Sequence, residues 1–190
     1  MPSSSRDRIV TAAGELFARD GIKASGVNAI IAASGVAKAT FYRQFRSKDD
    51  LVAAWLESSI APRVDEMLAA IEAPTPAQRL DLLFDGITER LAAGNFAGFP
   101  FVSAAMELPE GPSQVRDLVQ GQLADTRAVL SELATSAGAP DPEACARQVQ
   151  LLLLGLLIRV RAEPGARVEA GHSARDAARL LLGLPPHPLP

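Results

Sequence analysis

The chain is poor in the residues that most enzymes and metal sites use. Among its 190 residues there is one cysteine, Cys145, and the only histidines are His172 and His187. One thiol cannot form an intramolecular disulfide, and a plain buried cysteine is the simplest interpretation. The sequence also lacks a Ser-His-Asp set, a Cys/His cluster with metal-ligand spacing and a glycine-rich phosphate loop. These absences argue against an enzyme and predict that the chain takes no cofactor and no metal.

Long apolar runs are also missing. The longest extends from Leu151 to Ile158 and includes Gly155, whereas a helix that crosses a bilayer needs about 20 apolar residues. Residues 1–8 are polar, and no apolar segment of a secretion signal follows them. Together with the unpaired thiol, this predicts a cytoplasmic protein with no membrane partner. Aromatic residues make up only 5 %, whereas alanine and leucine dominate a hydrophobic content of 48 %, which favours helices.

Negative charge is scarce at the start of the chain. The formal net charge is −3, but residues 1–48 carry 8 Lys+Arg against 3 Asp+Glu, and residues 49–190 carry 11 against 19. All three lysines, Lys23, Lys38 and Lys48, fall in the first segment. This asymmetry indicates a basic head that contacts an anion and an acidic body that does not. A chance excess of cations on a solvated face is the alternative.

Apolar residues recur at helical spacing along most of the chain, and no segment is a convincing strand. The sequence therefore predicts an all-α fold of about nine helices. We expect a three-helix, helix-turn-helix head at 1–50, a helical body for effector binding and dimerisation at 51–184, and a proline-rich tail at 185–190. The last helix is expected to extend from about residue 173 to 182.

Glycines and capping residues predict where the helices of the head begin and end. Gly21 ends the first helix, and Gly35 provides the turn between the second and third. Ser47 is expected to cap the fourth helix, with Asp50 in the acidic position of a capping box. Because apolar spacing resumes after Pro62, this helix is expected to continue beyond it with a kink.

The segment Ser34–Phe45 has the composition of a helix that reads DNA. Phe41 and Phe45 lie four residues apart, so one face can be buried. On the other face, lysine, threonine and tyrosine can contact phosphates, and arginine and glutamine can pair with base edges. The alternative is that Tyr42 packs on the core of the head and Arg43 is an ordinary surface cation. The residues predicted to contact DNA are Lys38, Ala39, Thr40, Tyr42, Arg43 and Gln44, with Lys48 at the start of the fourth helix.

A series of positions between residues 6 and 55 follows one family pattern. It comprises Arg8-Ile9-Val10, Ala12-Ala13, Leu16-Phe17, Gly21, Val27, Ile30, Gly35-Val36, Thr40-Phe41-Tyr42, Phe45, Ser47-Lys48 and Leu51. This segment resembles the DNA-binding domain of TetR-family (TetR/AcrR) transcriptional regulators. The resemblance implies a lesser role near Asn28 and DNA contact for Lys38, Thr40, Tyr42, Arg43, Gln44 and Lys48. It also implies a body that binds a small inducer and forms a homodimer.

Two positions depart from the family pattern, which usually has threonine at position 26 and serine at position 37. Here they are Gly26 and Ala37. Both usual residues can cap a helix, and losing a cap costs roughly 0.5–2 kcal/mol. Ser25 is expected to replace the missing cap of the second helix.

In the body, the stretch from Gly98 to Glu107 is similar to a Gly-Cys-Pro-Phe…Glu stretch in one branch of the family, with Phe99 in place of the cysteine. The resemblance places the inducer pocket among the body helices. Few aromatic and polar groups there predict a mainly apolar effector. The candidate lining residues, each also explicable as core, are Trp55, Met67, Phe84, Phe96, Phe99, Phe101, Met106 and Leu123, with Glu107 and Arg90 as candidate polar anchors.

The apolar run from Leu151 to Ile158 is interpreted as part of a dimer interface, with a central core helix as the alternative. In the family, the last two helices of each subunit form a four-helix bundle across a two-fold axis. The expected function is a ligand-responsive repressor that binds a near-palindromic operator; an activator, or a non-specific architectural DNA-binding protein, is the alternative. The predicted interface residues are Leu151, Leu154, Leu157, Ile158, Leu180 and Leu181.

Overall fold

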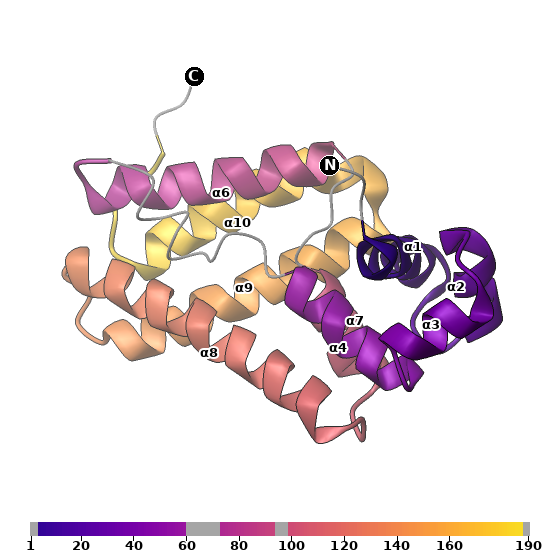
Figure 1. The fold of residues 1–190 in the computed structure, drawn as a ribbon. Helices are drawn as coiled ribbons and strands as arrows, with labels where there is room; N and C mark the ends of the chain where they lie inside the picture. Colours follow the sequence, from indigo (N-terminus) through magenta and orange to yellow (C-terminus); the bar gives the residue numbers. More distant parts are fainter. Residues whose placement is uncertain (1–3, 60–72, 94–98, 188–190) are drawn as a thin grey trace. The chain divides into compact units, whose positions relative to one another are not determined.

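The computed structural model describes residues 4–59, 73–93 and 99–187. Within these ranges the chain forms nine α-helices and one 3-10 turn, and no strand, which confirms the predicted all-α fold (Figure 1). None of the described helices is long and apolar enough to span a membrane. The elements are α1 (Ser5–Asp20), α2 (Val27–Ser34), α3 (Lys38–Gln44), α4 (Lys48–Ser58), α6 (Pro76–Ala92), α7 (Phe99–Glu107), α8 (Ser113–Ser136), α9 (Pro142–Ala162), η1 (Pro164–Ala166) and α10 (Arg167–Leu181).

The chain divides into two compact units. The first comprises Met1–Ala61 and Ala97–Gln122, so it contains α1 to α4, α7 and the first part of α8. The second comprises Pro62–Phe96 and Leu123–Pro190 and contains α6, the rest of α8, α9 and α10. The predicted head of residues 1–50 lies within the first unit, and α7 is grouped with it.

α1 packs against α2, α3 and α4 and so forms the centre of the first unit. It ends at Gly21, whose φ of 91° favours glycine. Phe17 meets Trp55 of α4 edge-on, with ring centroids 5.0 Å apart. Gly14 permits this approach, because a Cβ there would lie 2.8 Å from the indole nitrogen of Trp55. The buried stripe of α1 has the predicted helical spacing and consists of Ile9, Val10, Ala12, Ala13, Leu16 and Phe17.

The second and third helices begin without side-chain caps. α2 follows Gly26 and α3 follows Ala37, and neither residue makes a capping side-chain hydrogen bond. The expectation that Ser25 replaces the cap of α2 is wrong. Its hydroxyl instead donates to the carbonyl of Gly21 at 2.7 Å, which ties the loop back to the end of α1.

At the start of α4, only one of the two hydrogen bonds of the predicted capping box is formed. The hydroxyl of Ser47 accepts the backbone N–H of Asp50 at 3.0 Å, as expected of an N-cap. The carboxylate of Asp50, however, accepts the backbone N–H of Arg46 at 3.2 Å rather than that of Ser47. The described part of α4 ends at Ser58, and the predicted continuation past Pro62 lies outside the described residues.

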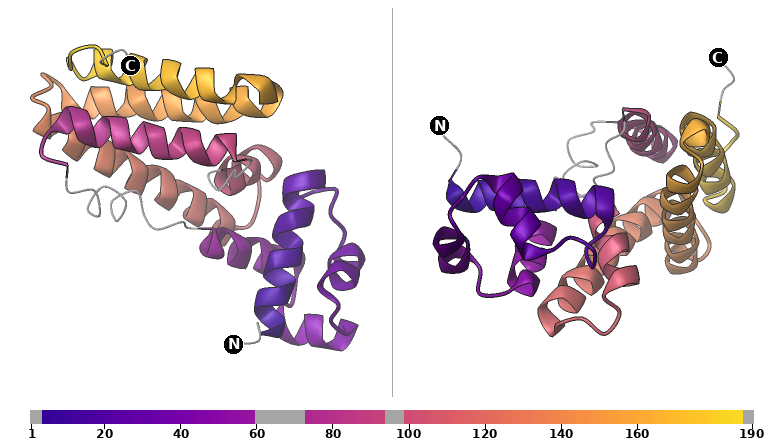
Figure 2. Two further views of the ribbon diagram at one scale, coloured as in Figure 1. Left: turned by 90° about the horizontal axis from the view of Figure 1, so that it is seen from above. Right: turned by 90° about the vertical axis from the view of Figure 1, so that its right-hand side faces the viewer.

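In the second unit α10 runs alongside α6 and α9 (Figure 2). Gly171 of α10 packs so closely on Thr88 of α6 that a Cβ at this position would collide with the threonine side chain. α10 begins at Arg167, which corrects the predicted start near Ser173. The glycine lies inside the helix, where it allows two helices to approach closely.

Two arginines of α10 pair with aspartates of α6. Arg179 donates to Asp81 at 2.6 Å, and Arg175 donates to Asp85 at 2.9 Å. Both guanidinium groups belong to buried residues, so these pairs are needed to satisfy their charge. Arg179 also donates to the carbonyl of Pro185 at 2.6 Å and thereby holds the start of the tail against the unit.

Candidate nucleic-acid interface

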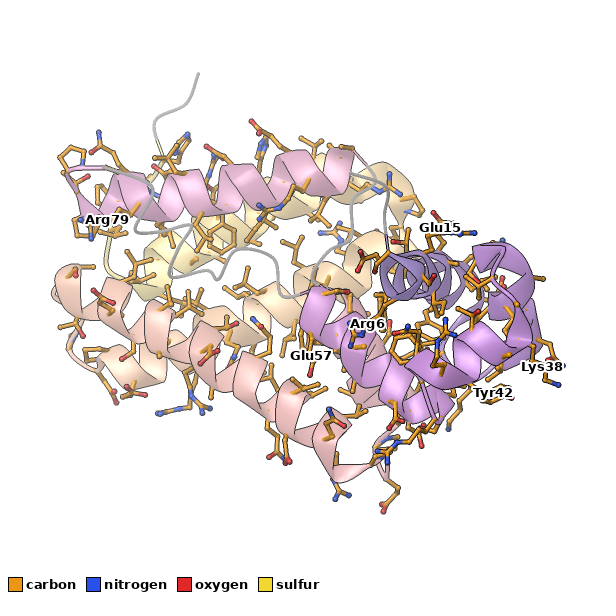
Figure 3. All side chains as sticks on the ribbon, in the orientation of Figure 1. Arg6, Glu15, Lys38, Tyr42, Glu57 and Arg79 are labelled. Carbon is orange, nitrogen blue, oxygen red and sulfur yellow. The ribbon has the colours of Figure 1, made fainter. Side chains whose placement is uncertain are left out.

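α3 separates its apolar and polar residues onto opposite faces. Phe41 is fully buried, and Phe45, directly after the helix, is also buried. Figure 3 shows Lys38 and Tyr42 projecting outward from α3. The exposed residues are Lys38, Ala39, Tyr42, Arg43 and Gln44, and Thr40 is half-buried. The predicted contacts between residues 38 and 44 are therefore presented together on one short helix.

Tyr42 is oriented by its aromatic neighbour while much of its surface stays accessible. Its ring meets that of Phe41 edge-on, with centroids 5.3 Å apart and an interplanar angle of 81°. Tyr42 is nevertheless 48 % exposed. This exposure does not fit the alternative in which the tyrosine packs inside the head. A ring held at one edge and open at the other suits a contact with a second molecule.

Two arginines of α1 contact the turn between α2 and α3 and the residue that follows α3. Arg8 donates from Nη2 to the carbonyl of Ser34 at 2.7 Å and to that of Gly35 at 3.1 Å. Arg6 lies over the ring of Phe45, 5.2 Å from its centroid. Neither role follows from the sequence pattern. The available signal is Gly35 itself, because a left-handed residue at a helix end (φ 63° here) leaves carbonyls that need a donor.

The other two predicted DNA contacts lie on the helices before and after α3. Asn28 is exposed in the first turn of α2. Lys48 begins α4, is half-buried, and donates from Nζ to the carbonyl of Lys23 at 3.2 Å. Burial lowers the pKa of Lys48 below its ordinary value, while the carboxylates of Glu107 and Asp49 act in the opposite direction. The ammonium is thus partly engaged by the loop between α1 and α2.

The family model for bacterial regulatory proteins of the tetR family matches residues 9–55, the segment that holds this helix-turn-helix. Residues 9–55 form a DNA-binding domain of the TetR family. Among solved structures, a TetR-family regulator from Streptomyces coelicolor has a TM-score of 0.80 at 23 % identity, covering 94 % of each chain. A putative tetR transcriptional regulator from Streptomyces avermitilis has a TM-score of 0.72 at 28 % identity, covering 95 % of this chain and 97 % of that one. No curated protein sequence matches significantly.

The candidate effector-binding residues fall in both compact units. Trp55 is buried between α1 and α4, and Phe84 and Phe101 are also buried. Met106 is 69 % exposed, whereas Leu123, Arg90 and Glu107 are half-buried. Met67, Phe96 and the side chain of Phe99 lie outside the described residues. The lining set as a whole stays a prediction. Within the described ranges, no group of three or more His, Cys, Asp or Glu residues is arranged to hold a metal.

The predicted dimer residues include the most exposed leucines in the described part of the second unit. Leu151 is 68 % exposed and Leu180 is 74 % exposed. Ile158 is also exposed and lies seven residues after Leu151, so both share one face of α9. Leu154, Leu157 and Leu181 are half-buried. In a single chain these side chains leave apolar surface open to solvent, as expected for a surface that a second molecule covers.

Proposed function

We propose that the chain is a transcriptional repressor that binds a near-palindromic operator as a homodimer and is released by a small, mainly apolar effector. The observation that carries this proposal is the face of α3. There Lys38, Tyr42, Arg43 and Gln44 are exposed opposite the buried Phe41. A helix with this division fits the major groove of B-DNA, and the TetR-family DNA-binding domain at residues 9–55 supports a DNA-binding regulator.

Each exposed group of α3 has a chemical task in such a complex. Lys38 and Tyr42 contact phosphate oxygens and set the register of the helix in the groove. Arg43 donates two hydrogen bonds to one guanine, and Gln44 pairs with adenine. Because Ala39 adds only a methyl group, the helix backbone can approach the base edges closely. Base contacts by Arg43 and Gln44 therefore provide the specificity, and the other contacts provide affinity.

The homodimer is supported by the exposed apolar face of α9 and α10. Leu151, Ile158 and Leu180 would be covered by the same residues of a second copy across a two-fold axis. Such symmetry presents two copies of α3 to DNA. Their half-sites would lie about one helical turn apart or a multiple of it, about 34–36 Å per turn. The operator is expected to be near-palindromic for this reason.

Release is proposed to follow from a shift between two conformations of the dimer. The effector is inferred to be apolar because the candidate lining residues, such as Phe84 and Phe101, are mostly apolar. It would bind more tightly to a conformation in which the two heads no longer match the operator spacing. A repressor must reach the chromosomal DNA, which in a bacterium lies in the cytoplasm, and this agrees with the predicted cytoplasmic location.

Selection of duplexes from a random library by the full-length protein tests this function. The affinity for the selected duplex should exceed that for random duplex by ~10³ or more at one salt concentration. Arg43→Ala should weaken binding to the selected duplex by about 1–3 kcal/mol. Arg147→Ala removes the same charge from an exposed position on α9 and should leave this preference unchanged. Equal affinity for both duplexes would contradict the proposal and favour the architectural alternative.

A further inference from the structure

The carboxylate of Glu107, at the end of α7, binds the loop that joins α1 to α2. Oε1 accepts the backbone N–H of Ile22 at 3.1 Å, and Oε2 accepts the backbone N–H of Lys23 at 2.9 Å. The partners are 85 and 84 positions apart in the sequence but belong to the same compact unit. One carboxylate therefore satisfies two successive amides of the head, through hydrogen bonds strengthened by its charge.

The loop is shaped around this carboxylate. Gly21 has a φ of 91°, and a Cβ at this position would lie 3.2 Å and 3.3 Å from the two oxygens of Glu107. Ile22 is buried, so the loop is also anchored from its apolar side. A glycine at position 21 thus provides both the backbone turn and the space in which the carboxylate lies.

Lys48 binds the same loop through the next peptide group along the chain. The backbone N–H of Lys23 is bound by Glu107, and its carbonyl accepts a hydrogen bond from Nζ of Lys48 at 3.2 Å. The charge of Glu107 also favours the protonated form of Lys48 and so acts to raise its pKa. Glu107 thus binds the backbone of Lys23 directly and is linked to Lys48 through the carbonyl of Lys23.

We propose that Glu107 is a positioning residue for DNA binding. By fixing the loop, it orients Lys23 and Lys48 so that both ammonium groups reach DNA phosphates. The side chain of Lys23 is exposed. Lys48 uses one of its three N–H donors on the loop and keeps two for phosphate. This inference rests on the proposed function and adds to it: the DNA-binding surface depends on the position of α7.

The negative charge of Glu107 would act on DNA affinity in the opposite direction to positioning. A carboxylate beside a basic head repels phosphates, and its removal alone would raise the affinity for any DNA. Positioning predicts a lower affinity for the operator when Glu107 is removed, because the two lysines lose their orientation. The sign of the change therefore separates the two effects.

The test uses the full-length variants Glu107→Gln and Glu107→Ala, with Glu110→Gln as the control. Glu110 is exposed, follows α7 closely, and gives the same loss of charge. Glutamine keeps the size of the side chain and one acceptor oxygen, so this variant remains informative where alanine prevents folding. Amide hydrogen exchange at Ile22 and Lys23 should be about tenfold faster in Glu107→Gln and unchanged in Glu110→Gln.

The salt dependence of DNA binding is the readout that a general loss of stability would not change. Glu107→Ala should bind the selected duplex ~10-fold more weakly, and its salt dependence should fall by about one to two phosphate contacts. A smaller folded fraction would lower the affinity without altering the salt slope. Higher affinity, an unchanged salt slope or unchanged amide exchange would overturn the inference. Failure of the wild-type protein to prefer any selected duplex would instead overturn the proposed function.

Discussion

Replacing Ala37 with serine should stabilise the head, because α3 begins without a side-chain cap. Ala37 is exposed and has the extended backbone of an N-cap residue, with φ −68° and ψ 147°. Phe41 donates the first hydrogen bond of the helix to the carbonyl of Ala37 at 3.1 Å. The N–H of Thr40 precedes that bond and is the group that a serine hydroxyl would accept.

The size of the effect follows from the reverse substitution in other helices. Exchanging a serine cap for alanine costs about 1 kcal/mol, so Ala37→Ser should gain about as much. For a chain of this length, each kcal/mol raises the melting temperature by about 2–4 °C. The chain has a single tryptophan, Trp55, which packs against Phe17 in the first unit. Its fluorescence during denaturation reports on the unit that contains the substitution.

Ala105→Ser is the matched control for the added hydroxyl. Ala105 is exposed within α7 and belongs to the same unit, but it is not at a cap. Serine there should lower the free energy of unfolding by about 0.5 kcal/mol, since it is a poorer helix former than alanine. Stabilisation by Ala37→Ser with retained DNA binding is the expected result. No change, or a fall in stability, would refute the cap assignment at position 37.

Two further substitutions address the turn of the head and the dimer. Arg8→Met removes the hydrogen bonds to the carbonyls of Ser34 and Gly35 at the end of α2. It should lower the free energy of unfolding by about 1 kcal/mol and weaken operator binding. Arg116→Met, at an exposed position of α8, is the control. Leu151→Glu should convert the dimer to folded monomers in analytical ultracentrifugation, because it would bury a charge in the interface. Leu82→Glu, at an exposed leucine of α6, should leave the dimer intact. A dimer that survives Leu151→Glu would place the interface elsewhere.

The features that could be predicted from sequence are those that depend on the spacing of apolar side chains along the chain. The stripe of α1 and the four-residue spacing of Phe41 and Phe45 indicate which faces are buried, and the structure agrees. The contacts of Arg8 and Glu107 leave no such pattern, because their partners are backbone groups, which every residue type carries. α10 begins at Arg167 rather than near Ser173, and its close contact at Gly171 depends on a partner helix that spacing within α10 does not reveal.

Charged side chains from outside α2 bind the carbonyls at its end and the loop before its start. Gly26 provides no side-chain cap at its start, and the left-handed Gly35 ends it. Arg8 of α1 binds the carbonyls at that end, and Glu107 of α7 binds the loop that leads into the helix. Because α3 follows directly after the Gly35 turn, its position depends on contacts from α1 and α7. Glycine at position 26 and alanine at position 37 are therefore compatible with an ordered helix-turn-helix, since contacts from two other helices hold the turn and the loop around α2.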